Sequence, residues 1–232
     1  MIPESDREEN IQSYIRQITL AQEEERKRIA RDLHDDISSR LLLLIKKIET
    51  MAAQSRSKNA RVKQDFSELR DRAVDALEAL RRTAQGLRPR IIDDLGLVAA
   101  VEWLAEETEK HAPFTVSVTS SGMAAGPSGE VSIVLFRIAQ EALTNIRKHA
   151  GARHVSINIT GSREDVRVEI SDDGKGFTVP ESVEAYAQKG HLGLIGMQER
   201  ARLMNGTLDI SSSPGKGTTI TASLPLGTEE RR

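Results

Sequence analysis

Cysteine is absent from this chain of 232 residues, so the chain can form no disulfide and cannot bind zinc through thiolates. No apolar run approaches the ~20 residues of a membrane-spanning helix, and the N-terminal residues lack the apolar segment of a signal peptide. Aromatic residues make up only 3% of the chain, which suits helical surfaces better than a sandwich core. These absences predict a soluble cytoplasmic fragment whose full-length protein is membrane-anchored only if a region outside this sequence supplies the anchor.

Neither sign of charge dominates the chain, because the formal net charge is only -2. Residues 1–90 contain 19 basic and 16 acidic residues, and residues 91–232 contain 14 basic and 19 acidic ones. Neither half has the strong positive field of a nucleic-acid binder. We therefore expect no direct binding of nucleic acid.

Glycine and proline are almost missing from the first third of the chain. All 16 glycines lie at or after Gly86, and no proline occurs between Pro3 and Pro89. Because both residues interrupt helices, residues 5–85 are predicted to be nearly continuous helix. The polar stretch 52–59 is the predicted turn between two helices.

Apolar residues in these helices recur in alternating steps of three and four. One such stripe is Ile37, Leu41, Leu44, Ile48 and Met51. Stripes of this kind need partner helices, and two long hairpins would close a four-helix bundle, so the sequence predicts a homodimer.

The stripe changes phase close to a histidine. The step from Ile29 to Ile37 is eight residues rather than seven, which predicts a local change of helix winding around His34. Two interpretations fit this spacing equally: a mechanical joint that transmits an upstream signal, or a static seam in which Leu33 bridges two stripes.

The pattern changes after a predicted linker at residues 86–97. We expect helices at about 97–111, 128–149 and 193–205, and strands at about 114–119, 154–160, 166–171, 207–212 and 218–224. Helices mixed with hairpin strands predict an α+β layer sandwich.

The first candidate for chemistry is His34, which is followed directly by Asp35. A neutral imidazole can attack phosphorus through one nitrogen while a neighbouring carboxylate orients the ring and offsets the developing charge. The alternative is an ordinary seam residue, because His34 continues the core spacing of Ile37 and Leu41.

Another candidate site is a helix face that carries Glu141 and Asn145, with Lys148 and His149 one turn further on. Amide and carboxylate oxygens suit Mg²⁺, and a lysine can neutralise phosphate charge. A solvated helix face is the alternative for these residues taken alone.

Glycine-rich turns supply the remaining candidates. Asp172 ends a strand and is followed by Gly174 and Gly176, so its carboxylate could accept a hydrogen bond from an adenine amino group, unless the segment is a plain Asp-Gly turn. The motif Gly190-x-x-Gly193-x-x-Gly196 precedes a helix, whose N-terminal N–H groups can bind phosphate. Residues 177–189 between these motifs would form a mobile lid. Thr218 could reach an adenine pocket through water.

The four motifs together resemble those of sensor histidine kinases of two-component systems. They are Glu25–Asp35, Glu141–His149, Asp172–Phe177 and Gly190–Met197, in this order. Arg28 to Asp35 is most similar to the phosphoacceptor segment of the nitrate-, desaturase- and cell-wall-stress-sensor subfamily. The resemblance covers residues 20–226 and implies a dimeric helical phosphotransfer hairpin followed by a Bergerat-type ATP-binding domain.

The resemblance also implies roles for single residues. His34 would be the phosphoacceptor, Asp35 its general base, Glu141 a further catalytic residue and Asn145 the Mg²⁺ ligand. The implied residues around ATP are Asn145, Lys148, His149, Asp172, Gly174, Gly176, Gly190, Gly193, Leu194, Gly196, Met197 and Thr218. The implied partner is the receiver domain of a response regulator, often fused to a helix-turn-helix domain.

One position departs from the family pattern. Many relatives have Gln five residues after the histidine, where it is associated with dephosphorylation of the partner, whereas this chain has Ser39. We therefore expect weak phosphatase activity.

The predicted divisions are a signalling coiled coil at 1–25, the phosphotransfer hairpin at 26–88, a linker at 89–96, the ATP-binding domain at 97–227 and a tail at 228–232. Two other functions remain open from the sequence. An anti-sigma-type serine kinase would share the ATP-binding fold, and a coiled-coil scaffold would have no enzymatic activity.

Overall fold

The computed structural model describes most of the chain between residues 13 and 226. The described residues are 13–14, 17–18, 20–22, 24–26, 28–30, 32–54, 60–87, 90–122, 127, 129–180 and 192–226. Side chains are not described for His34, Asp35, Ala60, Gln85, Leu87 and Arg90. Residues 21–90 form one compact unit, and residues 91–232 belong to a second. The domain boundaries expected from the sequence stay predictions.

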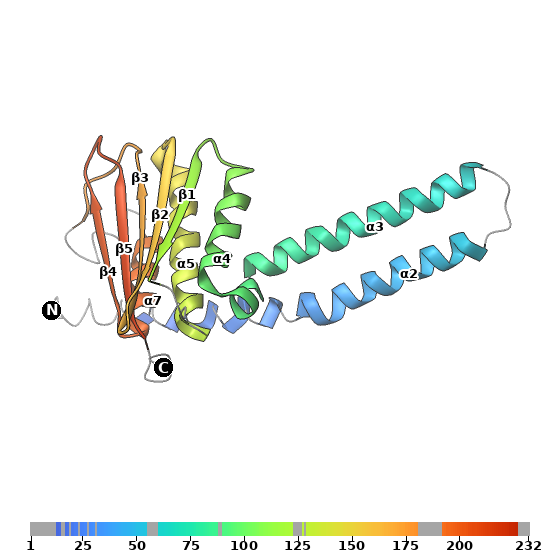
Figure 1. The fold of residues 1–232 in the computed structure, drawn as a ribbon, viewed down its shortest axis with the longest axis horizontal. Coiled ribbons are helices and arrows are strands. Elements are labelled where there is room, and N and C mark those ends of the chain that lie inside the picture. Colours follow the sequence, from blue (N-terminus) through green and yellow to red (C-terminus); the bar gives the residue numbers. More distant parts are fainter. Residues whose placement is uncertain are drawn as a thin grey trace, which may run out of the picture. The chain divides into compact units, whose positions relative to one another are not determined.

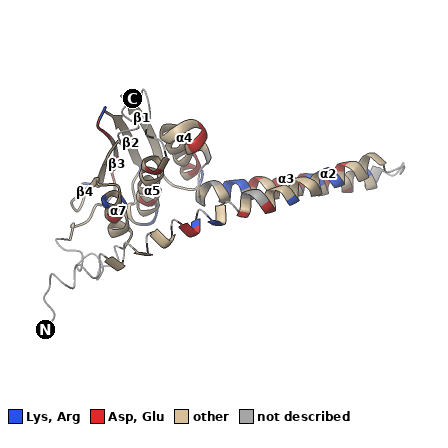
Figure 2. Cartoon of the chain, turned by 90° about the horizontal axis from the view of Figure 1, so that it is seen from below, with Lys and Arg blue, Asp and Glu red and all other residues tan. Residues whose placement is uncertain are grey.

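The first unit is a helical hairpin (Figure 1). Its elements are the π-helix η1 (Leu33–Ile37), α2 (Ser38–Gln54) and α3 (Ala60–Leu87). Few apolar side chains are buried in it, among them Ala73 and Leu77, and the Arg70 Nε–Glu49 Oε1 ion pair of 3.0 Å joins α3 to α2. Figure 2 shows that basic and acidic residues are interspersed along α3.

The second unit contains a five-stranded sheet. Its strands are β1 (Thr115–Ser121), β2 (His154–Gly161), β3 (Asp165–Asp172), β4 (Thr207–Ser212) and β5 (Thr218–Pro225), in the order β1-β2-β3-β5-β4. β1 runs parallel to β2, and the other neighbours are antiparallel. These strands agree with the predicted ones to within two residues. In β2, β3 and β5, buried side chains alternate with more exposed ones along the strand.

Helices cover one face of this sheet (Figure 1). They are α4 (Arg90–Glu109), α5 (Gly129–Asn145), its continuation as the π-helix η2 (Ile146–Ala150), and α7 (Leu192–Leu203). Together with the inward side chains of β2, β3 and β5 they form one apolar core, which includes the fully buried Phe136, Ile157 and Leu224. The expected layer sandwich of helices on a mixed sheet is confirmed.

The predicted linker is largely helical in the structure. Residues 90–95 belong to α4, which is interrupted at Gly96, where φ is 83°. Only glycine adopts this backbone conformation without strain, so Gly96 divides a short helical turn from the longer helix predicted at 97–111. Among the described helices, none combines the length and the apolar character that crossing a bilayer requires.

Candidate functional site

A cavity of about 310 Å³ lies between the helices and the end of the sheet in the second unit. Its described lining residues are Ala142, Asn145, Ile146, His149, Ala150, Ile170, Asp172, Lys175, Gly176, Phe177, Gly193, Leu194, Thr218 and Ile220. Seven of the residues that were predicted from the sequence to lie around ATP line this cavity: Asn145, His149, Asp172, Gly176, Gly193, Leu194 and Thr218. The structure therefore brings residues from three separate motifs to one cavity.

One wall of the cavity is a single face of α5 and η2. Ala142, Asn145, Ile146 and His149 follow one another at steps of three, one and three, which places them on one side of a helix. The π-turn of η2 ends at Gly151, whose φ of 64° stops the helix. The wall therefore combines two apolar side chains with an amide and an imidazole.

The opposite wall consists of two cross-strand pairs. Asp172 lies opposite Thr218, and Ile170 lies opposite Ile220, between the antiparallel strands β3 and β5. Because side chains two residues apart point to the same face of a strand, all four belong to the face that the helices cover. A flat ligand in this cavity would meet two isoleucines beside a carboxylate and a hydroxyl.

Asp172 is the buried carboxylate of this wall, with 7% of its surface exposed. Burial raises the pKa of the Asp172 carboxyl above its ordinary value of 3.8, and the nearby Asp173 adds to the rise. Hydrogen bonds from the backbone N–H groups of Gly174 and Thr218 oppose the rise, with Gly174 N lying 2.8 Å from Asp172 Oδ1. The carboxylate is thus held in place by the turn that follows it.

Glycine is required where this turn approaches its neighbours. A Cβ atom at Gly174 would lie 2.6 Å from the Ala150 carbonyl oxygen. Gly217 has a φ of 72°, and a Cβ atom there would overlap the backbone oxygen of Asp172. Gly176 has a φ of 58°, and a Cβ atom there would overlap the Ser213 backbone oxygen. The Asp-Gly-x-Gly segment therefore packs backbone to backbone against η2 and the β4–β5 turn.

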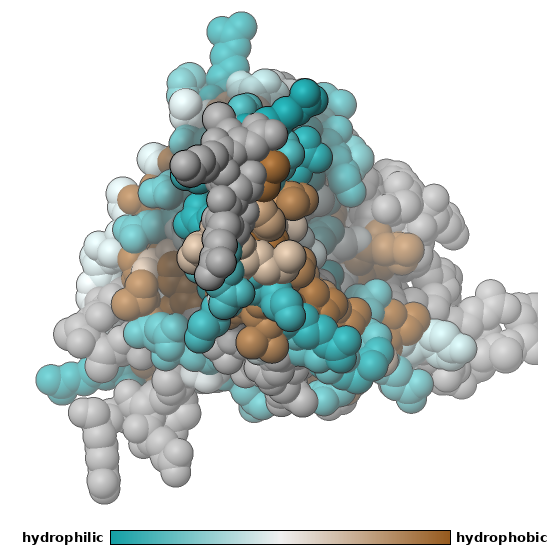
Figure 3. Space-filling model, turned by 90° about the vertical axis from the view of Figure 1, so that its right-hand side faces the viewer, coloured by the Kyte–Doolittle hydropathy of each residue, from teal (hydrophilic) through white to brown (hydrophobic). Residues whose placement is uncertain are grey.

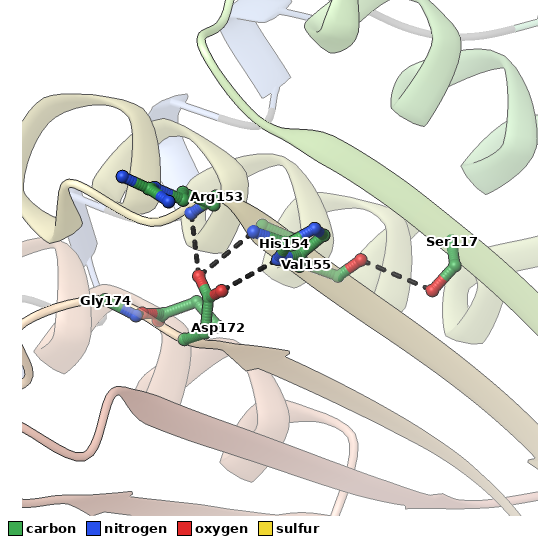
Figure 4. Close-up of polar contacts among 7 residues, drawn as sticks. Ser117, Arg153, His154, Val155, Asp172 and Gly174 are labelled. Carbon is green, nitrogen blue, oxygen red and sulfur yellow. Dashed lines mark hydrogen bonds and ion pairs between the residues drawn. The ribbon is translucent and has the colours of Figure 1, made fainter.

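Asp173 fixes the start of β2 from the other side of the same turn (Figure 4). Its Oδ1 accepts the N–H groups of Arg153 and His154 at 2.7 and 3.0 Å, and its Oδ2 lies 2.9 Å from His154 Nδ1. The N–H and the ring of His154, followed by the N–H of Arg153, hold the pKa of Asp173 well below its usual range. The two neighbouring carboxyls are therefore shifted in opposite directions, with the pKa of Asp172 raised and the pKa of Asp173 lowered.

Glu141 approaches the cavity from α5 through a contact with Gly193 of α7. A Cβ atom at Gly193 would overlap Glu141 Oε1 and would lie 3.6 Å from Asn145 Nδ2. The absence of a side chain at Gly193 thus lets the carboxylate and the amide of α5 reach the first turn of α7.

Other predicted residues lie away from the cavity lining. Gly196 and Met197 belong to the second turn of α7, and Met197 is fully buried in the core. The Gly196 N–H is inside the helix, so it is not among the first free N–H groups that could bind phosphate. Lys148 is exposed on η2, and Gly174 supports Asp172 from behind. Gly190 and most of the predicted lid lie outside the described residues.

His34 lies in the hairpin unit, within η1. Residues 33–37 form a π-helix, in which Leu33 O accepts the Ser38 N–H, five residues further on. The Ser38 hydroxyl donates to the same oxygen at 3.1 Å, and Ser38 is buried. One extra residue in a turn accounts for the step of eight between Ile29 and Ile37, so the predicted local change in winding is confirmed.

Sequence reasoning missed the apolar lining of the cavity. Ile170 and Ile220 each lie two residues from a nominated residue on the same strand, and Ala142 and Ile146 lie on the Asn145 helix face. Side chains two residues apart on a strand, or three to four apart on a helix, share a face, so this periodicity could have identified these four apolar residues.

The helical hairpin and the sheet unit each match a protein-family model. Residues 130–228 match the family described as histidine kinase-, DNA gyrase B-, and HSP90-like ATPase, and residues 25–91 match a family described as histidine kinase. The chain belongs to the sensor histidine kinase family.

Relatives in this family cover nearly the whole chain. Signal transduction histidine-protein kinase/phosphatase DegS of Brevibacillus brevis is 35% identical over 220 residues, which are 94% of this chain and 56% of DegS. Sensor histidine kinase MctS of Rhizobium johnstonii is 36% identical over 209 residues, which are 88% of this chain and 44% of MctS. The chain thus spans about half the length of the curated relatives it matches.

A solved structure supports the fold alone. The histidine kinase domain from the Erythrobacter litoralis EL346 blue-light activated histidine kinase is 20% identical, with a TM-score of 0.50. The match covers 83% of this chain and 96% of that domain.

Proposed function

We propose that this chain is the kinase core of a two-component sensor, which transfers the γ-phosphoryl group of ATP to His34 and then to an aspartate of a response regulator. The observation that carries the proposal is the cavity that unites Asn145, Asp172 and Gly193 from three motifs. An anti-sigma-type serine kinase is not favoured, because residues 25–91 match a histidine kinase family.

Adenine is the base that the proposed site would select. The Asp172 carboxylate would accept a hydrogen bond from the adenine amino group, whereas guanine has an oxygen at that position. Ile170, Ile220 and Ala142 line the same cavity and would pack against the base. Gly174 and Gly176 would act indirectly, because their lack of side chains lets the Asp-Gly-x-Gly segment pack against η2 and the β4–β5 turn.

The phosphates would lie toward Asn145 and the first turn of α7. Asn145 has the amide oxygen that suits Mg²⁺, Glu141 approaches it through Gly193, and Lys148 would neutralise phosphate charge. Bound Mg²⁺ would offset charge on the phosphate oxygens. Gly190 and Leu194 would contribute to the phosphate turn. The roles of Gly196 and Met197 would be indirect, through the packing of α7.

The transfer itself needs a nucleophile and a proton acceptor. A nitrogen of His34 would form the bond to the γ-phosphorus as the bond between that phosphorus and the oxygen of ADP breaks. Asp35 would stabilise the positive charge on the ring and take up the proton from its other nitrogen. Rate acceleration would come mainly from positioning and charge neutralisation.

A homodimer is the assembly that the hairpin supports best. Ile37, Leu44 and Met51 of the predicted seam are 41%, 50% and 49% exposed in the single chain. Figure 3 views the molecule from the hairpin end and shows apolar side chains open at the surface. A second hairpin would cover them in a four-helix bundle.

Autophosphorylation with γ-labelled ATP and Mg²⁺ tests the proposal, with the wild type beside His34→Gln. Acid-labile, alkali-stable label that disappears in His34→Gln is the expected result, while both proteins bind ADP equally. Acid-stable label that survives His34→Gln would instead identify a serine kinase. No measurable nucleotide binding would favour the non-enzymatic scaffold.

Phosphatase activity toward the phosphorylated partner should be weak, because Ser39 is two heavy atoms shorter than the Gln of many relatives. The Ser39 side chain is exposed, so Ser39→Gln is expected to raise the dephosphorylation rate without loss of stability. Strong ADP-stimulated dephosphorylation by the wild type would overturn this expectation.

A further inference from the structure

Ser212 connects three parts of the cavity wall through one hydroxyl group. It is the last residue of β4 and pairs with Thr218 across the sheet. Its Oγ lies 2.9 Å from Phe177 N, 2.9 Å from Gly217 O and 3.0 Å from Thr218 Oγ1. The hydroxyl therefore touches the Asp-Gly-x-Gly segment, the β4–β5 turn and a lining residue.

Counting protons determines the direction of each of these hydrogen bonds. A serine hydroxyl has one hydrogen and two acceptor positions. The Gly217 carbonyl can only accept, so the Ser212 hydrogen is donated to it, and the Phe177 N–H donates to Ser212 Oγ. The remaining contact is completed only if the Thr218 hydroxyl donates its hydrogen to Ser212 Oγ.

The direction of this last bond decides what Thr218 presents to a ligand. Thr218 lines the cavity directly opposite Asp172 on the neighbouring strand. With its hydrogen committed to Ser212, the Thr218 oxygen can only accept a hydrogen bond, as can an ionised Asp172. This end of the cavity thus offers two adjacent acceptors and no hydroxyl donor from Thr218.

We propose that Ser212 is a positioning residue that fixes the Thr218 hydroxyl as an acceptor and thereby sharpens the preference for a 6-amino purine over a 6-oxo purine. A 6-amino group supplies two N–H donors to the two acceptors, whereas a 6-oxygen supplies none. The inference rests on the proposed nucleotide site and assigns part of its base specificity to a residue outside the cavity lining.

Calorimetric titration of the whole chain with ADP and with IDP measures this preference without turnover. The ratio of the two dissociation constants is expected to favour ADP in the wild type and to fall about five-fold in Ser212→Ala, because the freed Thr218 hydroxyl can then donate to the 6-oxygen. Ser213→Ala is the matched control, since Ser213 is the exposed neighbour, and it should keep the wild-type ratio. Ser212→Thr keeps the hydroxyl and should restore the ratio.

A double mutant tests whether Ser212 acts through Thr218. Thr218→Val removes the hydroxyl at nearly constant shape and should lower the ratio by itself, after which Ser212→Ala should lower it no further. A purely structural role would weaken both nucleotides equally and leave the ratio unchanged, which would overturn the inference. A further fall in the Thr218→Val background would also overturn it.

Two outcomes separate this inference from the proposed function. Wild-type protein that binds neither nucleotide contradicts the ATP site itself. Wild-type protein that binds both equally contradicts only the specificity. If Ser212→Ala does not fold, Ser212→Cys replaces it, because a thiol of similar size is a weak donor and acceptor and should lower the ratio in the same direction.

Discussion

Apolar side chains are buried to different extents in the two compact units. In the α+β unit, Ile157, Val168 and Ala222 have no exposed surface, because the chain's own helices cover the sheet. In the hairpin, Leu44 and Met51 keep about half of their surface exposed, at 50% and 49%. The α+β unit therefore buries its core within one chain, whereas the hairpin leaves its predicted seam exposed for the second copy that we propose.

The largest effect is expected from a charge on that seam. Leu44→Glu should convert the proposed dimer to a monomer, because burying an unpaired carboxylate in a bundle is unfavourable. Leu43→Glu is the control, since Leu43 is 68% exposed and lies off the predicted stripe. Sedimentation measures both. A dimer that persists in Leu44→Glu would place the interface elsewhere.

The second prediction tests the close packing of the α+β unit. Gly217→Ala should destabilise this unit by about 3 kcal/mol, because positive φ strain adds to an overlap with the Asp172 backbone. Gly215→Ala has a φ of 81° but nothing within 4 Å of its Cβ, so it should cost only about 1 kcal/mol. Denaturant unfolding measures the free energy of unfolding of both variants. Equal losses would show that backbone strain at positive φ, without the overlap, accounts for the destabilisation.

A third prediction separates catalysis from stability within the same unit. Gly193→Ala would push against the end of the flexible Glu141 side chain, which can move aside, so stability should change by less than about 1 kcal/mol. The displaced carboxylate should lower the autophosphorylation rate about ten-fold. Gly196→Ala is the control, because its Cβ would make only an ordinary contact of 3.6 Å. An unchanged rate in Gly193→Ala would remove Glu141 from the proposed mechanism.

The smallest effect concerns pH. Since burial raises the pKa of Asp172, protonation starts at a higher pH than for an ordinary Asp, and the protonated form loses an acceptor for the adenine amino group. ADP affinity should therefore weaken a few-fold as the pH falls, and this weakening should begin at a higher pH than an ordinary aspartate would cause. The folded state binds this proton more tightly than the unfolded chain, so this group does not lower stability over the same range. Asp172→Asn should bind weakly with no such pH dependence, and an identical slope would assign the titration elsewhere.

Periodicity in the sequence predicts most of the elements but only part of the site. Alternation placed β3 near residues 166–171, and the structure has Asp165–Asp172. The contact of Glu141 with Gly193 joins two helices far apart in the chain, so no local pattern contains it. Met197 followed a glycine motif, yet its side chain lies in the core. Motif spacing identifies which residues are near each other in sequence, but packing decides which of them face the cavity.

The π-turn at Leu33–Ile37 affects how a rotation of the first helix could act on the hairpin. A π-turn contains one residue more than the α-helical turn it replaces, and one residue corresponds to about 100° around the axis. Moving the turn by one position along the helix reorients the residue that it passes, while the helix on either side keeps its own register. The backbone direction within Leu33–Ile37 would then change in discrete angular steps, and the hydrogen bond from the Ser38 hydroxyl to Leu33 O would favour the position of the turn found in this structure.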